Sequence, residues 1–230
     1  MPHSGTQSRL PILETEGHVE AVEIKREGLR TWTQGLTERG AHDLVAEVAD
    51  ASLLPEAEAL LRKLAHYMTS YGVQLEAEET IAHGYWAVKV RDEQPGRFEL
   101  WEYNKEATAF VAGVGLTLEY WRDQHAVCQR YGVEFSPPKP NQLVVLSDGV
   151  LQGDAVEGVR YPSPPHMSGW WITTDRYDGD IRSLTQEHLY HLTAARPDLA
   201  RYLALPFGFR INQANDEAVW FDEKVAREES

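Results

Sequence analysis

The sequence predicts an α+β protein, with mixed and antiparallel sheets, packed helices and an arrangement that allows two subdomains. Two stretches have the apolar spacing and end signals of helices, and several short runs alternate as strands do. Strand clusters are mixed with helices instead of alternating with them strictly. The chain has 230 residues, of which 42% are hydrophobic, so it can bury a core without disulfides.

The N-terminal part is expected to begin with an arm and two short strands. Residues 1–17 are polar and contain Gly and Pro, which predicts a loose arm. The runs HVEAVEIK and LRTWT, joined by REG, predict two strands with a turn between them. The following stretch, LTERGAHDLVAEVADA, has roughly helical spacing of its apolar residues Leu36, Leu44, Val45 and Val48, although Gly40 weakens its first half.

The clearest helix is predicted over residues 55–71. Pro55 suits the first helical position, and the acidic residues after it suit the positive end of the helix dipole. Gly72 predicts the C-terminal end, because glycine readily adopts the left-handed conformation found there. The expected buried stripe comprises Leu60, Leu61, Leu64, Met68 and Tyr71.

Three strand-like runs follow this helix, and a second helix comes after them. The runs are VQLEAEET, YWAVKVR and RFELWEY, and DEQPG predicts a hairpin between the last two. The second helix is predicted over residues 117–131, with Thr117 as its cap and Gly132 as its end. Cys128 lies on its apolar stripe, which favours a buried small side chain. A nucleophile near His125 is the alternative, but an apolar stripe is a poor setting for a thiolate.

A proline-rich segment, SPPKPNQ, predicts a boundary near residues 136–142. We expect an N-terminal α+β region over residues 18–136 and a C-terminal α+β region over residues 142–230. In the latter, LVVLSDG and GWWITTD predict strands, SLTQEHLYHLTAA and PDLARYLAL predict helices, and FGFRI with AVWFDE predicts an antiparallel pair. Trp170 and Trp171 point to opposite faces of a strand, and we expect Trp170 to pack inward.

Composition narrows the class of partner. The formal net charge is −14, from 36 acidic and 22 basic residues. Such a surface repels nucleic acid and anionic membranes and attracts a basic protein, although solubility alone also accounts for many acidic chains. With one cysteine, no apolar leader and no long apolar run, the sequence predicts a cytoplasmic protein that does not span a membrane.

No local pattern predicts a metal or cofactor site. His188 and His191 have the spacing of paired ligands on a helix, with Glu187 adjacent, but a zinc site needs a third protein ligand and the sequence has no HExxH motif. Asp175, Asp178 and Asp180 lack the spacing of a calcium loop. We therefore expect no metal and no cofactor. Carboxylates paired from distant positions, as in glycosidases, would leave no local pattern.

The C-terminal region carries a resemblance. The segment SGWWITTDRYDGDIRSLTQEHLYHLTAARPDLARYLALPFGFRI, with AVWFDE after it, resembles the immunity proteins of bacterial polymorphic toxin systems and is most similar to immunity family thirty-three. This resemblance implies a cytoplasmic antidote that binds and blocks a cognate toxin, and it transfers no catalytic residue. Residues 1–140 lie outside it, so their role stays open. The matching residues are Gly169–Asp180, Arg196–Leu199, Leu205–Phe209 and Val219–Asp222.

Partner-binding residues are predicted where the strand GWWITTD ends in a turn. A strand exit of this kind presents side chains on a rigid support, with an aromatic anchor beside carboxylates that suit a basic toxin. We expect a protein-binding immunity module without catalytic residues; the alternative is a small hydrolase or metal-dependent enzyme with dispersed residues. The oligomeric state stays open. The predicted partner-binding residues are Trp171, Asp175, Tyr177, Asp178 and Asp180.

Overall fold

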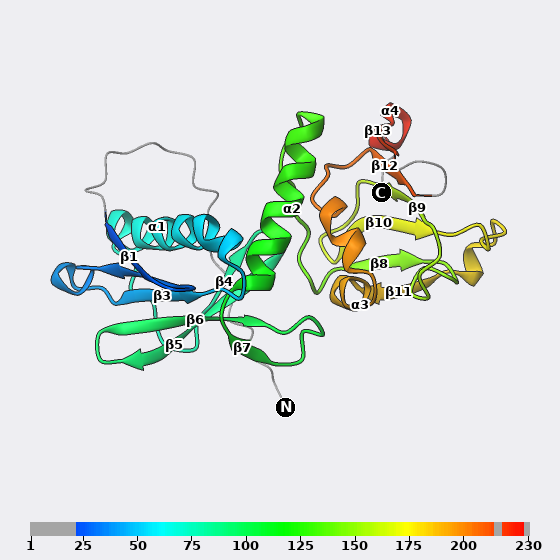
Figure 1. Cartoon of the computed structure of the whole chain (residues 1–230). Helices are drawn as coiled ribbons and strands as arrows, with labels where there is room; N and C mark the ends of the chain where they lie inside the picture. Colours follow the sequence, from blue (N-terminus) through cyan, green and yellow to red (C-terminus); the bar gives the residue numbers. More distant parts are fainter. Residues whose placement is uncertain (1–21, 214–217, 228–230) are drawn as a thin grey trace. The chain divides into compact units, whose positions relative to one another are not determined.

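The computed structural model describes residues 22–213 and 218–227 (Figure 1). The arm expected at residues 1–17, and the start of the first expected strand, lie outside the described residues. The predicted α+β class is confirmed, because two mixed sheets are accompanied by helices.

Backbone contacts divide the chain into two units. One extends to Asn104 and includes Thr108–Glu119, and the other comprises Lys105–Ala107 and the chain from Tyr120 onward. The division between them along the sequence falls within helix α2 (Gly115–Tyr131). Each unit has one sheet, so the two sheets are described separately.

The N-terminal unit is built on a seven-stranded sheet with the order β1-β2-β3-β6-β5-β4, in which β7 also pairs with β6. β3 and β6 are parallel, and the other pairs are antiparallel. The hairpin predicted between YWAVKVR and RFELWEY is confirmed. The strands are β1 (Glu23–Glu27), β2 (Arg30–Gln34), β3 (Asp43–Glu47), β4 (Thr80–His83), β5 (Trp86–Gln94), β6 (Arg97–Tyr103) and β7 (Phe110–Ala112).

Helix α1 (Leu54–Tyr71) covers one face of this sheet (Figure 1). It follows a 3-10 turn, η2 (Ala51–Leu53), and ends at Gly72, whose φ of 63° is left-handed and whose N–H donates to the carbonyl of Met68. The predicted helix over 55–71 is therefore confirmed. Its buried side chains join those of the sheet in one apolar core, although Tyr71 is exposed.

The helix predicted around residues 36–48 is wrong. This stretch forms a short 3-10 turn, η1 (Thr37–Arg39), and then strand β3. Leu44, Val45 and Ala46 are all fully buried between β2 and β6, and a strand buried on both faces has a continuous apolar run that helical spacing also fits. The turn is fixed by Asp43, whose carboxylate accepts from the backbone N–H of Leu36 at 3.1 Å.

The predicted helix over 117–131 is confirmed as α2, but its cap is not Thr117. The helix begins at Gly115, and the carboxylate of Glu102 on β6 accepts from the N–H groups of Leu116 (3.0 Å) and Thr117 (2.6 Å). A capping residue so distant in sequence leaves no local pattern. Cys128 is buried as expected, and burial raises the pKa of its thiol.

The C-terminal unit is built on a six-stranded sheet with the order β11-β8-β10-β9-β12-β13. β8 and β10 are parallel, and the other pairs are antiparallel, including the predicted pair of β12 and β13. The strands are β8 (Leu143–Leu146), β9 (Glu157–Arg160), β10 (Met167–Thr173), β11 (Thr185–His188), β12 (Phe209–Asn212) and β13 (Ala218–Phe221).

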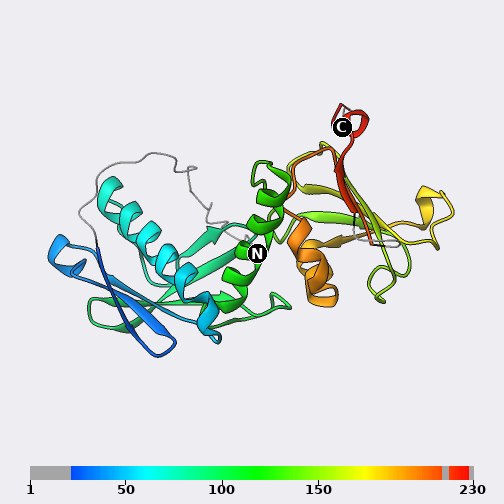
Figure 2. The same cartoon turned by 45° about the horizontal axis from the view of Figure 1, so that its top comes forward.

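Helix α3 (Leu189–Ala195) and the 3-10 helix η4 (Pro197–Tyr202) lie against one face of this sheet (Figure 2). The single helix predicted for SLTQEHLYHLTAA is wrong in its first part, because β11 pairs there with β8 before α3 begins. PDLARYLAL forms η4 and not an α-helix. Two further short elements are η3 (Ile181–Ser183) and α4 (Glu223–Ala226).

Candidate partner-binding surface

One face of the C-terminal sheet carries a row of paired residues on four strands. The register pairs Trp171 with Val159, Val159 with Arg210, and Arg210 with Trp220. Residues directly opposite each other on neighbouring strands point to the same face of a sheet. Trp171 is 37% exposed and Trp220 is 43% exposed, so both indole rings are accessible to solvent. We call this row, together with Tyr161, the open face.

The opposite face of the same strand is buried. Trp170 and Ile172 have no exposed surface, and the indole Nε1 of Trp170 donates to the carbonyl of Leu203 at 3.1 Å. The expectation that Trp170 packs inward is confirmed. Strand alternation thus separates a core side from an accessible side within three consecutive residues.

Two glycines with left-handed backbone lie near this end of the sheet, where the ring of Tyr161 meets that of Trp171 edge-on at 6.1 Å. Gly169 has a φ of +83°, and a Cβ there would lie 2.2 Å from the carbonyl oxygen of Tyr161. Gly208 has a φ of +91°, and a Cβ there would lie 2.6 Å from the ring of Phe221. Any other residue would be strained at these φ values, and at Gly169 it would also require a backbone shift.

A concave pocket of about 760 Å³ opens where β10 leaves the sheet. Thr173 and Glu157, a direct cross-strand pair, lie two residues beyond the pair of Trp171 and Val159 and so on the same face. The pocket therefore continues the open face. Three carboxylates and one guanidinium contribute to its lining, which consists of Asp154, Ala155, Glu157, Thr173, Thr174, Asp175, Arg176 and Tyr177.

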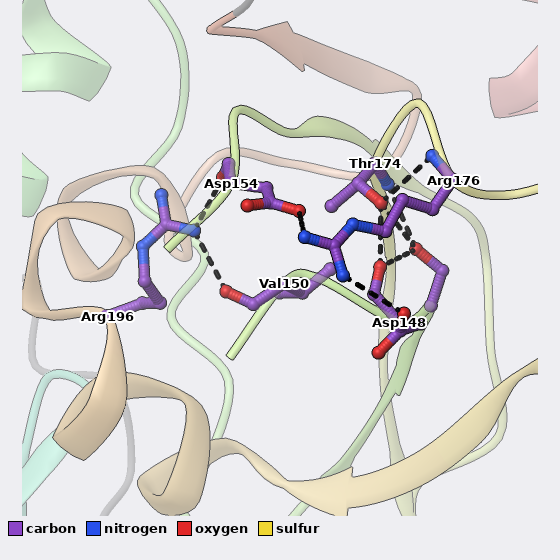
Figure 3. A network of polar contacts seen from close by, with 7 residues as sticks. Asp148, Val150, Asp154, Thr174, Arg176 and Arg196 are labelled. Atoms are coloured by element: carbon purple, nitrogen blue, oxygen red, sulfur yellow. Dashed lines mark hydrogen bonds and ion pairs between the residues drawn. The ribbon is translucent and has the colours of Figure 1, made fainter. Parts of the chain in front are cut away.

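The loop that leads into the pocket is held from the solvent side by Arg176 (Figure 3). Its guanidinium pairs with the carboxylate of Asp154 at 2.8 Å and with that of Asp148 at 3.3 Å. The hydroxyl of Thr174 donates to the carbonyl of Asp148 at 2.6 Å. Gly149 has a φ of +87°, and a Cβ there would lie 2.4 Å from the Asp154 carboxylate, so only glycine fits this turn.

A second guanidinium, that of Arg196, holds the same loop from the protein side (Figure 3). Arg196 is buried, and its Nη1 donates to the carbonyls of Val150 and Asp154, both at 2.9 Å. Asp198 receives a bidentate contact from Arg196 at 3.0 and 2.9 Å, which lowers the pKa of that carboxyl group. Asp154 is thus fixed at its carbonyl by Arg196 and at its carboxylate by Arg176.

Arg160 supports the core side of the sheet. It is buried, and its guanidinium donates to the carbonyls of Ser168 (3.0 Å), Ser136 (2.6 Å) and Leu203 (3.1 Å), and also to that of Leu205. Burial lowers its pKa to about 10. The bonds to Leu203 and Leu205 satisfy carbonyls of the segment between η4 and β12, which explains how this segment, without regular backbone pairing, packs beneath the sheet.

The predicted partner-binding residues are only partly gathered at this surface. Trp171 lies on the open face, and Asp175 and Tyr177 line the pocket. Asp178 and Asp180 are not in the pocket lining: Asp178 accepts from the N–H of Asp180 at 2.9 Å and Asp180 caps η3. The role of these residues in binding stays a prediction.

Sequence reasoning missed most of the surface, including Asp154, Glu157, Arg210 and Trp220. Asp154 lies in the loop before β9, whereas Glu157, Arg210 and Trp220 reach the surface through the register of β9, β12 and β13. The local signals were weak: Asp154 follows a glycine-containing turn, and Trp220 alternates with its neighbours in AVWFDE.

The two histidines considered as ligands have separate contacts. His188 Nδ1 lies 2.9 Å from the carbonyl oxygen of Asn141, and His191 Nδ1 lies 2.9 Å from the Glu187 carboxylate. Within residues 22–213 and 218–227, no group of three His, Cys, Asp or Glu residues is placed to hold a metal ion. No helix in this part of the chain is long and apolar enough to cross a membrane.

Residues 123–222 match the Imm33-like domain family. The matched range contains the complete six-stranded sheet, the open face and the pocket. The resemblance to immunity family thirty-three is therefore confirmed for this part of the chain. No curated protein and no solved structure matches the chain significantly.

Proposed function

We propose that the protein is a bacterial immunity protein that acts in the cytoplasm and neutralises a cognate protein toxin by binding it through the open face. The observation that carries this proposal is that the Imm33-like domain contains an accessible row of large side chains and an acidic pocket next to it. A toxin held against this surface would be blocked by contact, without any chemical step.

The open face has the properties of an interface centre. Tryptophan is enriched among the residues that dominate binding energy, and rigid strands hold the two indole rings so that little conformational freedom is lost on binding. Trp171 and Trp220 are three strand spacings apart, or roughly 14 Å at about 4.8 Å per strand. An interface of standard size buries about 800 Å² on each partner, so the row occupies its middle and other residues form its rim.

Charge supports a basic partner. The chain carries a net charge of −14, and the pocket lining has three carboxylates against one guanidinium. A basic toxin would be attracted over a distance of about one Debye length, roughly 8 Å at physiological salt. Electrostatic attraction of this kind speeds association and helps to exclude acidic partners.

The test begins with the partner. The full-length protein is purified from its native cells, and proteins that accompany it in equal amounts are identified. Each one is then expressed alone and together with this protein in a host that lacks both. The proposal predicts growth arrest by the partner alone and rescue on co-expression, with a stable complex on gel filtration. A partner that does not impair growth, or rescue without complex formation, contradicts it.

A matched pair of variants tests the surface. Trp171→Ala with Trp220→Ala should abolish rescue, whereas Trp32→Ala with Trp101→Ala, on the other sheet, should leave it intact. Both proteins are first checked for wild-type circular dichroism, so that loss of rescue reflects binding and not misfolding. Equal rescue by the two double variants would place the interface elsewhere.

A further inference from the structure

We infer that the pocket at the end of the open face is a socket for one arginine side chain of the partner protein. The inference rests on the proposed function, since it names the chemical group that the bound partner presents. It commits to a protein partner with an arginine at its surface, while residues beside that arginine pack on Trp171 and the rest of the row.

Within the described residues, two carboxylates of the pocket have no cation beside them. Arg176 forms ion pairs with Asp148 and Asp154, which accounts for one of the three lining carboxylates. Among residues 22–213 and 218–227, the hydrogen-bond donor to the Glu157 carboxylate is the neutral amide of Asn212, at 2.8 Å. Asp175 has no hydrogen bond or ion pair in the described parts of the chain and senses Arg176 only at longer range. The lining thus offers negative charge that its own residues do not balance.

An arginine of the chain already binds carboxylates at the rim of this pocket. The guanidinium of Arg176 bridges two carboxylates on the rim of the pocket, as Figure 3 shows. A planar fork with several donors can bridge carboxylates that an ammonium group contacts one at a time. A second guanidinium next to the first would find Glu157 and Asp175 as partners.

Aromatic side chains favour arginine over lysine. Tyr177 contributes to the pocket lining, and Trp171 lies on the same face next to the pair of Thr173 and Glu157. A guanidinium is weakly hydrated and stacks on aromatic rings, whereas an ammonium group keeps its water more strongly. The same preference is already used elsewhere in this chain, where Arg91 lies 4.2 Å from the ring centre of Trp101.

The size of the pocket is sufficient. A volume of about 760 Å³ falls within the range of roughly 300–1,000 Å³ that holds whole small ligands, so one side chain enters with room for water. The loop that carries Asp154 is fixed from both sides by Arg176 and Arg196, so the socket exists before the partner arrives. Pre-formed sites avoid an ordering cost on binding.

The test uses small probes and does not need the partner. Isotope-labelled full-length protein is titrated with N-acetyl-arginine amide, with the citrulline compound as a neutral isostere, and with the lysine compound. The inference predicts a saturable shift of the Trp171 indole N–H signal, with a dissociation constant on the order of millimolar for arginine. Citrulline should bind at least about fivefold more weakly and lysine in between, and the difference should shrink at high salt.

Two double variants with the same change in charge provide the control. Glu157→Gln with Asp175→Asn should abolish the preference for arginine over citrulline, whereas Glu38→Gln with Asp92→Asn, both exposed on the N-terminal unit, should preserve it. Equal binding of arginine and citrulline by the wild-type protein overturns the inference, and so does a preference that survives the pocket variant. If the probes fail but the Trp171 and Trp220 variant still loses rescue, the proposed function stands without the arginine socket.

Discussion

Each of the two sheets has a face that no helix of the described residues covers, and the aromatic residues on these two faces have different contacts. In the N-terminal sheet, Arg97 lies 5.9 Å from the ring centre of Trp32 and Arg91 lies 4.2 Å from that of Trp101. The indole of Trp101 also donates to Glu99 at 2.7 Å. In the C-terminal sheet, no cation of the described chain lies over Trp171 or Trp220.

The difference indicates which face is left for a partner. Charged side chains already stack on the aromatic rings of the N-terminal sheet, so a partner there would have to displace existing contacts. The exposed parts of Trp171 and Trp220 instead gain burial only when another molecule covers them, at about 25 cal/mol for each Å² of apolar surface. Similar residue types therefore serve internal stability on one sheet and remain available for binding on the other.

The largest expected effect on stability comes from Arg196, which holds the loop beside the open face. Arg196→Ala leaves two loop carbonyls without their donor and leaves the half-exposed Asp198 carboxylate with Gln213, which should lower the free energy of unfolding by about 2–4 kcal/mol. Arg97→Ala, on the uncovered face of the N-terminal sheet, should cost less than about 1 kcal/mol because its ion pair with Glu93 is partly solvated. Urea denaturation of both variants measures the difference, and equal losses would contradict it.

A smaller effect separates binding from stability. Trp171→Ala should weaken the complex with the partner by about 2 kcal/mol, or roughly 30-fold, while changing the free energy of unfolding little. Trp101→Ala should do the reverse: it removes the contacts with Arg91 and Glu99, costs about 1 kcal/mol of stability and leaves affinity unchanged. Calorimetric titration and urea denaturation give the two quantities. Loss of affinity in both variants would erase the distinction between the faces.

One carboxyl group in each unit, Glu102 and Asp198, should make the stability of the protein depend on pH, and the two dependences should have opposite signs. Burial raises the pKa of Glu102 above its ordinary value of 4.5, so its contribution to stability is present when it is protonated and is lost as the pH rises through the raised value. The hydrogen bonds from Arg196 lower the pKa of Asp198 below 3.8, so its contribution is present at neutral pH and is lost as the pH falls through the lowered value.

Conservative variants of these two residues can measure the opposite pH dependences. Relative to wild type, Glu102→Gln should gain stability as the pH rises from 4.5 toward neutrality. Asp198→Asn should become less stable than wild type as the pH rises from the lowered pKa to 3.8, the difference should stay constant above 3.8, and the two proteins should converge at lower pH. Urea midpoints measured across this range test both slopes. If the stability difference from wild type changed with pH in the same direction for both variants, the pKa shifts of Glu102 and Asp198 would not arise from the contacts described above.

The smallest effect is expected at the rim. Asp178→Asn keeps an oxygen that can accept from the N–H of Asp180 but removes one negative charge. Association with a basic partner should slow by less than about threefold at low salt and be unchanged at high salt, while dissociation stays constant. Stopped-flow mixing at two salt concentrations tests this, and a change confined to dissociation would assign Asp178 a direct contact.

Local sequence signals predicted the two long helices because the residues that mark their ends lie next to them in the sequence. Pro55 and Gly72 frame α1, and Gly132 follows α2. The sequence failed where distant partners decide the structure. β3 is a strand because β2 and β6 pair with its two edges, and β11 is a strand because β8 pairs with it.

The candidate surface divides in the same way. Alternation along β10 predicted that Trp170 and Trp171 lie on opposite faces but did not fix which of them is buried, and the turn after β10 pointed to Asp175 and Tyr177. Trp220 and Glu157 were missed because their place beside Trp171 depends on strand register, which the sequence does not display. The division into regions 18–136 and 142–230 stays a prediction.

The open face also bears on how such a protein changes over generations. The row from Trp171 to Trp220 is drawn from four strands, and its residues alternate with those that fill the core or contact it. Substitutions at accessible positions usually alter stability by no more than about 0.5 kcal/mol. The exposed positions Trp171 and Trp220 are therefore free to vary with little effect on the fold, whereas Arg210 is held by its ion pair with Asp222 at 2.8 Å. Under the proposed function, a change in the partner's surface could be matched by substitutions at these two positions while the protein stays folded.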